Sequence, residues 1–117
     1  MNETQLLNRH CQEYPSGTPP LTREAIERYL PLVPGWNVVD DGKTIRRTQR
    51  FEGGFLEAAH FLNRVAELAE EEDHHPDVRI YSYRMMDIDF ATHSIGGLSD
   101  NDFIMAAKVN RLFEQTG

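Results

Sequence analysis

The chain has 117 residues, of which 39% are hydrophobic and 26% are charged, and its net charge is −7. This length suits one domain with one hydrophobic core. The negative charge argues against binding of nucleic acid through its phosphates, because such binding needs a clustered basic surface.

Residues 1–20 are polar, and the segment 14–20 (YPSGTPP) carries three prolines and a glycine. We interpret residues 1–20 as an N-terminal arm and residues 21–117 as the folded domain. Cys11 is the only cysteine, which excludes an internal disulfide and a four-cysteine zinc site and favours a reducing compartment. No apolar run is long enough for a signal peptide or a membrane span, so we expect a cytoplasmic protein.

The first predicted helix begins after Thr22, whose side chain can cap the free backbone N–H groups of a first turn. Apolar residues recur at helical spacing over 25–30, and Pro31 and Pro34 end the helix. A β-hairpin follows, with strands over 36–39 and 44–51 joined by a turn that contains Asp-Gly. The alternating basic residues over 46–50 are expected to form a solvated face.

The segment 55–71 has apolar residues at helical spacing over more than four turns, which predicts a long amphipathic helix. Pro76 disfavours helical backbone at the residue before it, so this helix should end by residue 74 or 75. Two further strands are predicted over 78–83 and 85–93. In the second strand, apolar and polar residues alternate, which places His93 on the polar face at the end of the strand.

A last helix is predicted from about residue 99 to 115, after a turn at Gly96-Gly97. The order of elements is therefore helix-strand-strand-helix-strand-strand-helix. Two hairpins separated by a helix predict an α+β fold, a four-stranded antiparallel sheet with three helices on one face.

Histidines and carboxylates gather around residues 70–75. Four acidic residues, 70–73, end the long helix, where the helix dipole disfavours negative charge, and His74 and His75 follow. The predicted topology brings His93 to the same region. A carboxylate beside an imidazole stabilises its charged form and fixes which nitrogen carries the proton, as acid–base catalysis requires. The alternative is a solvated helix end with surface histidines.

Metal binding is a less favoured use of the three histidines. Adjacent residues diverge on a helix and point to opposite faces of a strand, so His74 and His75 cannot easily ligate one ion. Asp102 could cap the last helix in a box that begins at Ser99, and it could also remain ionised beside a substrate. Trp36 could be a core residue of the hairpin or a stacking wall for a flat heterocycle.

The ordered set of these residues resembles the signature of the pterin-4a-carbinolamine dehydratases. The matching residues are Glu70, His74-His75-Pro76, Tyr83, His93 and Asp102, with Gly35-Trp36, Arg64-Val65-Ala66 and Gly97-Leu98-Ser99 elsewhere. The resemblance covers about residues 21–113. The family fold, three helices on a four-stranded antiparallel sheet, agrees with the order of elements predicted above.

The resemblance implies dehydration of a 4a-hydroxytetrahydropterin to the quinonoid dihydropterin, which recycles the pterin of aromatic amino acid hydroxylases. The reaction involves no redox change, so no cofactor is implied. The implied catalytic residues are His74 as the base, with His75 and His93 serving the departing hydroxyl. Asp73 and Asp102 would orient the imidazoles or stabilise positive charge on the pterin. Glu70 and Trp36 would line the pocket.

Other roles known in this family stay open. Members assist a homeodomain transcription factor or Rubisco assembly in carboxysomes, and a pterin-related role in molybdenum cofactor metabolism is a third alternative. Non-catalytic relatives tend to lose active-site residues, and this chain keeps them, which favours an enzyme. The family also predicts a homodimer or homotetramer, with the pterin as substrate and no direct contact with nucleic acid or membrane.

Overall fold

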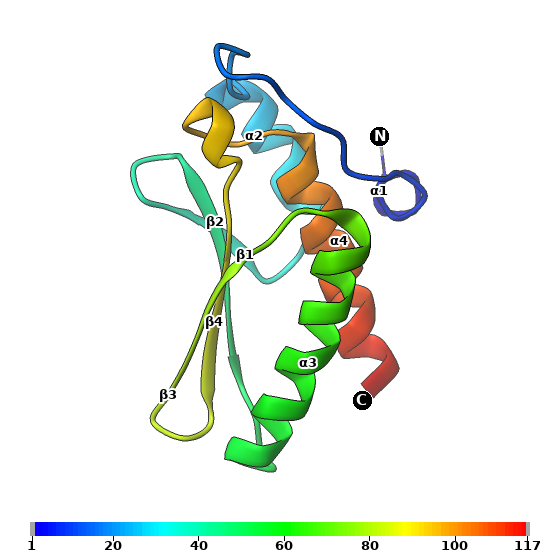
Figure 1. Cartoon of the computed structure of the whole chain (residues 1–117), viewed down its shortest axis with the longest axis vertical. Coiled ribbons are helices and arrows are strands. Elements are labelled where there is room, and N and C mark those ends of the chain that lie inside the picture. Colours follow the sequence, from blue (N-terminus) through cyan, green and yellow to red (C-terminus); the bar gives the residue numbers. More distant parts are fainter. Residues whose placement is uncertain (1, 117) are drawn as a thin grey trace.

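A single antiparallel sheet with the strand order β1-β2-β4-β3 forms one layer of the protein (Figure 1). The structure is a computed structural model and describes residues 2–116. The strands are β1 (Trp36–Val39), β2 (Thr44–Arg50), β3 (Asp77–Tyr81) and β4 (Met85–Phe90). The first hairpin, and the start of each strand of the second, lie within one residue of their predicted positions, because alternation and turn residues define them.

The helices α2 (Arg23–Tyr29), α3 (Phe55–Glu72) and α4 (Asp100–Thr116) cover one face of the sheet. The Thr22 side chain caps α2 by accepting a hydrogen bond of 3.2 Å from the Ala25 N–H, as predicted. The predicted α+β fold, with four antiparallel strands and three helices on one face, is confirmed. No helix within residues 2–116 is long and apolar enough to cross a membrane.

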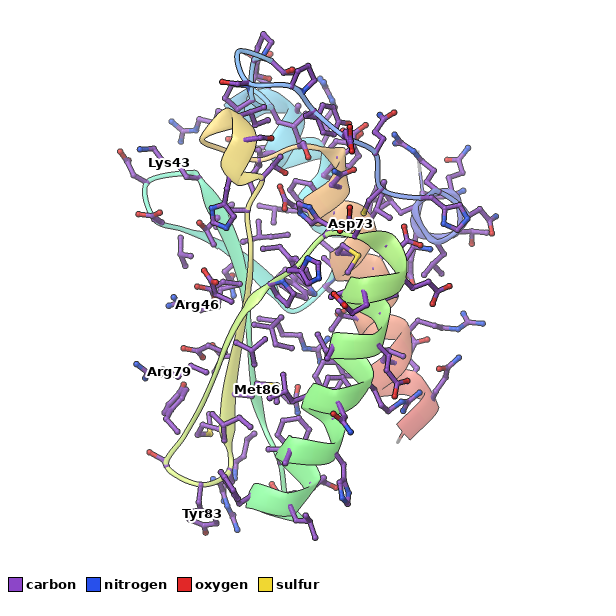
Figure 2. All side chains as sticks on the ribbon, viewed as in Figure 1. Lys43, Arg46, Asp73, Arg79, Tyr83 and Met86 are labelled. Carbon is purple, nitrogen blue, oxygen red and sulfur yellow. The ribbon has the colours of Figure 1, made fainter. Side chains whose placement is uncertain are left out.

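The two faces of the sheet differ in polarity. Met86, Ile88 and Phe90 alternate along β4 and are fully buried against the helices. On the other face, Arg46 of β2 donates two hydrogen bonds, of 2.7 and 2.9 Å, to the carboxylate of Asp89 on β4. Figure 2 shows Met86 on the helix side and Arg46 on the opposite side of the sheet. The polar face therefore pairs its own charges across strands.

Two predicted details are wrong. The strand β4 ends at Phe90, and His93 begins a short 3-10 helix, η2 (His93–Ile95). Alternation alone could not show this end, because Ala91 and Thr92 fit the strand pattern. Arg47 does not face solvent with its neighbours. Its guanidinium lies 4.0 Å from the ring centroid of Phe113 on the helix side, and burial lowers its pKa.

The N-terminal residues form a helix that the sequence analysis did not predict. Helix α1 (Glu3–Leu7) begins with a capping box, in which Asn2 and Gln5 bond each other's backbone N–H groups. Leu6 is fully buried, and α1 packs against α4. A five-residue helix is unstable alone, so this packing is what holds it.

The chain reverses direction in a tight turn between η2 and α4. Thr92 and Gly97 form an isolated antiparallel bridge, in which the Thr92 N–H donates to the Gly97 carbonyl at 2.9 Å. The next residue, Leu98, accepts a bond of 2.8 Å from the Leu21 N–H. A Cβ atom at Gly97 would lie 2.7 Å from the Cβ atom of Pro20, so this close approach needs glycine.

Candidate active site

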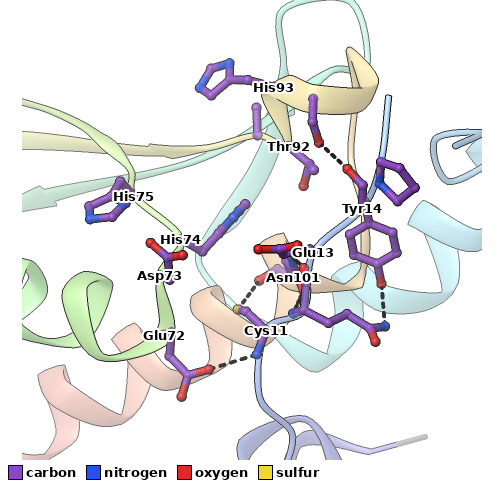
Figure 3. Close-up of a pocket in the computed structure, with 14 residues that line it drawn as sticks. Cys11, Glu13, Tyr14, Glu72, Asp73, His74, His75, Thr92, His93 and Asn101 are labelled. Atoms are coloured by element: carbon purple, nitrogen blue, oxygen red, sulfur yellow. Dashed lines mark hydrogen bonds between the residues drawn. The ribbon is translucent and has the colours of Figure 1, made fainter. Parts of the chain in front are cut away.

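The C-terminal end of α3, the segment after β4 and part of the N-terminal arm enclose a pocket of about 730 Å³ (Figure 3). His74, His75 and His93 all line it. The volume is within the range of roughly 300–1,000 Å³ that is common for small-molecule sites. Three titratable side chains thus converge on one cavity that is large enough for a small heterocycle.

A left-handed residue at the end of α3 separates the two adjacent histidines. Asp73 has φ = 53° and ψ = 43°, and its N–H and that of His74 both donate to the Ala69 carbonyl. Aspartate tolerates this conformation better than most residues. The turn sends the side chains apart, so His74 contacts the α4 side of the pocket and His75 turns back toward α3.

His74 forms the most buried histidine–carboxylate pair of the site. Its Nε2 lies 2.7 Å from Oδ1 of Asp102, a residue of α4 with 0% exposure. The ring lies nearly parallel to that of Phe90, at 12° and with 6.0 Å between centroids. The other oxygen of Asp102 accepts hydrogen bonds from the Thr92 hydroxyl at 2.8 Å and the Ser99 N–H at 2.9 Å.

These bonds determine the tautomer of His74. Because Oδ2 of Asp102 already accepts two donors, an ionised carboxylate suits this position, and Oδ1 accepts a third donor, the Nε2–H of His74. The neutral ring then carries its lone pair on Nδ1. Such a histidine can take up a proton at Nδ1 while the carboxylate stabilises the resulting positive charge.

Two residues that support this pair were missing from the predicted site. The hydroxyls of Thr92 and Ser99 lie 2.7 Å apart, and both residues are buried. Since the Thr92 hydroxyl donates to Asp102, the Ser99 hydroxyl donates to Thr92. Sequence reasoning treated Ser99 only as a helix cap. Its role in the Asp102 network depends on the return of the chain at Gly97, which is a tertiary feature.

The other two histidines are more exposed. Nε2 of His75 is hydrogen-bonded to a carboxylate oxygen of Glu70, one turn back on α3, and both side chains are largely exposed. The His93 side chain has no hydrogen-bond or ion-pair partner in the described part of the chain. It also borders a smaller hollow beside Arg46 and Asp89 on the polar face of the sheet. These two rings are therefore available to a bound molecule.

Glu72 explains why acidic residues end α3. Its buried side chain accepts hydrogen bonds of 2.8 Å from the Cys11 N–H and from Nδ1 of His10, and Lys108 lies 3.6 Å away. Burial by itself would raise the pKa of Glu72, but these three partners lower it below its ordinary value. The negative charge at this helix end thus has specific partners in the arm and in α4.

Cys11 lines the pocket and remains a thiol. Burial, together with the nearby negative charges of Glu72 and Asp102, raises its pKa to about 12. Cysteine acts as a nucleophile through its thiolate, so Cys11 is a poor candidate for that role. No group of three or more His, Cys, Asp or Glu side chains among residues 2–116 has an arrangement suited to a metal ion.

Neither Trp36 nor Glu70 lines this pocket, contrary to the role implied for both. Glu70 instead bonds His75. Trp36 lies in the core. Its indole is 4% exposed and lies 5.7 Å from the ring of Phe90, measured between centroids. The indole N–H donates a 2.8 Å hydrogen bond to Oδ1 of Asn110 on α4. Trp36 is a core residue at the base of the first hairpin, which was the alternative interpretation. Asp73, in contrast, does line the pocket.

Comparisons with known proteins agree on one family. The family model described as pterin 4 alpha carbinolamine dehydratase matches residues 19–112. A protein of Rubrobacter xylanophilus is 45% identical over 109 residues, which is 93% of this chain and 99% of the relative. One from Methylococcus capsulatus is 45% identical over 96% of both chains. Both are named "Putative pterin-4-alpha-carbinolamine dehydratase".

A solved structure shares the fold. The crystal structure of a transcriptional coactivator/pterin dehydratase from Brucella melitensis superposes with a TM-score of 0.73. It is 34% identical in sequence, and the match covers 80% of this chain and 97% of that chain.

Proposed function

Because the chain belongs to the pterin 4 alpha carbinolamine dehydratase family, we propose that it removes water from a 4a-hydroxytetrahydropterin. The product is the quinonoid dihydropterin, the form that is reduced again after aromatic hydroxylation. In this reaction the bond between C4a and its hydroxyl breaks, the hydroxyl gains a proton and leaves as water, and a ring nitrogen loses a proton. The enzyme must therefore supply one acid and one base.

His74 is suited to be the base. Its Nε2 is bonded to the buried Asp102, so Nδ1 holds the lone pair that would accept the proton from the pterin nitrogen. The carboxylate then stabilises the imidazolium. This pair, at 2.7 Å in a pocket that all three histidines line, is the observation that carries the proposal.

His75 and His93 would serve the departing hydroxyl. His75, whose Nε2 is hydrogen-bonded to the Glu70 carboxylate, would deliver a proton to the hydroxyl. His93, on the segment after β4, would orient the hydroxyl or the water formed from it. Asp73 at the pocket edge would stabilise positive charge on the pterin. A general acid or base contributes about 10²- to 10⁴-fold to such a rate.

A stopped-flow dehydration assay tests the proposal. A 4a-hydroxytetrahydropterin is generated in the instrument, and its loss of water is followed with wild type, His74→Ala and His93→Ala. We expect acceleration by wild type and a loss of at least about 10²-fold in His74→Ala, with a smaller loss in His93→Ala. Circular dichroism and thermal melts confirm that both variants fold.

An interaction factor without activity would behave differently. It would leave dehydration at the uncatalysed rate in wild type and in both variants. Wild-type rates in both folded variants would exclude histidine acid–base catalysis even if the protein is active. The homodimer or homotetramer expected from the family stays a prediction, which sedimentation analysis can test.

A further inference from the structure

The N-terminal arm forms one wall of the pocket. Residues 11–15 line it opposite the histidines, although they lie outside the 19–112 region that the family model matches. Figure 3 shows Glu13 and Tyr14 on the arm, across the cavity from His75. The region that the family model matches therefore accounts for the histidine wall, and the arm adds a second wall.

Two buried side chains hold the backbone of the arm in place. The Cys11 N–H donates to Oε1 of Glu72 at 2.8 Å. Gln12 is held twice by Asn101, because its N–H donates to Oδ1 at 3.0 Å and its carbonyl accepts from Nδ2 at 2.6 Å. Glu72 and Asn101 are 8% and 3% exposed. Bonds to buried partners are costly to break, so this part of the arm has a defined position.

The anchors of the arm lie beside the site residues in sequence. A third anchor, Ser94, donates its hydroxyl to the Tyr14 carbonyl at 2.8 Å. The anchors and their neighbours are Glu72 with His74, Asn101 with Asp102, and Ser94 with His93. Each segment that carries a site residue thus also binds the arm. The position of the arm is therefore tied to the geometry of the site.

The pocket is negatively charged apart from its histidines. Among the described residues that line it, three are carboxylates (Glu13, Glu72 and Asp73) and none is lysine or arginine. Glu72 has His10 and Lys108 as partners, whereas Glu13 and Asp73 have no hydrogen-bond or ion-pair partner within residues 2–116. A ligand with a negative side chain would therefore meet repulsion that no lysine or arginine of the lining offsets.

We propose that residues 11–15 of the arm are part of the substrate site and that Glu13 makes it selective for pterins with an uncharged side chain over pterins that carry a phosphate. This inference rests on the proposed function for the identity of the ligand. Glu13 is placed to act as the selecting residue because it is the unpaired carboxylate that the arm contributes to the pocket.

Titration calorimetry tests the inference without requiring turnover. The ligands are a 7,8-dihydropterin with a hydroxylated propyl side chain and its phosphate ester. We expect wild type to bind the uncharged pterin more tightly. Charge reversal in Glu13→Lys should shift the ratio of the two Kd values toward the phosphate ester by about three- to tenfold at low salt, and less in 0.5 M salt.

The control is Glu67→Lys, which alters an exposed carboxylate in the middle of α3 outside the lining of the pocket. It makes the same change in net charge and should leave the Kd ratio within about twofold of wild type. Equal binding of both pterins by wild type, or equal shifts in Glu13→Lys and Glu67→Lys, would overturn the inference. Binding with the expected preference but without dehydration would overturn the proposed function alone, and a failure to bind either pterin would overturn both.

Discussion

Replacement of Asp102 by asparagine isolates the role of the carboxylate that holds His74. The side chain keeps its size, and its amide oxygen can turn toward the Thr92 hydroxyl and the Ser99 N–H, which both donate to Oδ2 in wild type. The amide NH₂ then faces Nε2 of His74. Because NH₂ can only donate, Nε2 must become the acceptor and the proton moves to Nδ1.

The change removes the base without removing the histidine. The nitrogen that faces the pterin would now carry a proton, and no negative charge would remain to stabilise an imidazolium. In serine proteases, loss of the corresponding carboxylate costs about 10⁴-fold in kcat. We expect a decrease of about 10²- to 10⁴-fold in kcat for Asp102→Asn. Every polar group near residue 102 keeps a partner, so the free energy of unfolding should fall by only about 1–3 kcal/mol.

The measurement is stopped-flow dehydration over pH 6–9, with unfolding in urea followed in parallel. The matched control is Asp87→Asn, which alters another carboxylate that accepts hydrogen bonds from two side chains, Thr48 and Tyr81, on the polar face of the sheet. This control should keep wild-type kcat. If folded Asp102→Asn retained kcat within about threefold of wild type across this range, the tautomer argument would be refuted.

Three further predictions concern stability and reactivity. Trp36→Phe should lower the free energy of unfolding in urea by about 2 kcal/mol, because the hydrogen bond to Asn110 and part of the core volume are lost. Its kcat/KM should stay within twofold of wild type. A raised KM without destabilisation would contradict the core assignment. Cys11 should react with iodoacetamide at pH 8 roughly 10²- to 10³-fold more slowly in the folded protein than in urea. The reason is that its pKa is about 12 in the folded protein, against an ordinary value of 9.0. Equal rates in the two states would contradict this. Glu72→Gln should be about 1–2 kcal/mol less stable than wild type at pH 7. Folding lowers the pKa of Glu72, so the stability difference should be complete at pH values above the ordinary pKa of 4.5. It should disappear as the pH falls through the pKa of the folded state. A stability difference that stays constant from pH 7 to 3 would refute this linkage.

The regular elements could be predicted because each has a local cause. The Asp-Gly turn and the alternation around it define the first hairpin, and Thr22 defines the start of α2. The end of α3 followed from Pro76, and the helix does end at Glu72. These signals act within a few residues, so one sequence is enough to interpret them.

Helix α1 was missed because its stability is not local. Its five residues bury one side chain, Leu6, and the helix depends on α4, which is almost 100 residues away. A weak signal was present, since Asn2 followed three residues later by Gln5 fits a capping box. The strand pattern that extended to His93 failed for a similar reason, because the bridge between Thr92 and Gly97 turns the chain early.

The candidate site, too, was predictable only where local signals define it. Residue types and spacing indicated the histidines and Asp102, but the pairing of His74 with Asp102 and of His75 with Glu70 follows from the left-handed turn at Asp73. Trp36 was misplaced because an indole suits a core as well as a pocket. The arm wall could not be predicted, since its position depends on anchors in α3, α4 and η2 that lie far from it in sequence.

The absence of a side chain at Gly97 affects residues outside its own turn. A methyl group there would push against Pro20, and relief would require the backbone around residue 97 to move. That backbone accepts the Thr92 N–H, and the Thr92 hydroxyl in turn bonds the carboxylate behind His74. One added carbon in this buried turn before α4 would therefore displace the imidazole of His74, through a chain of hydrogen bonds that runs over Thr92 and Asp102.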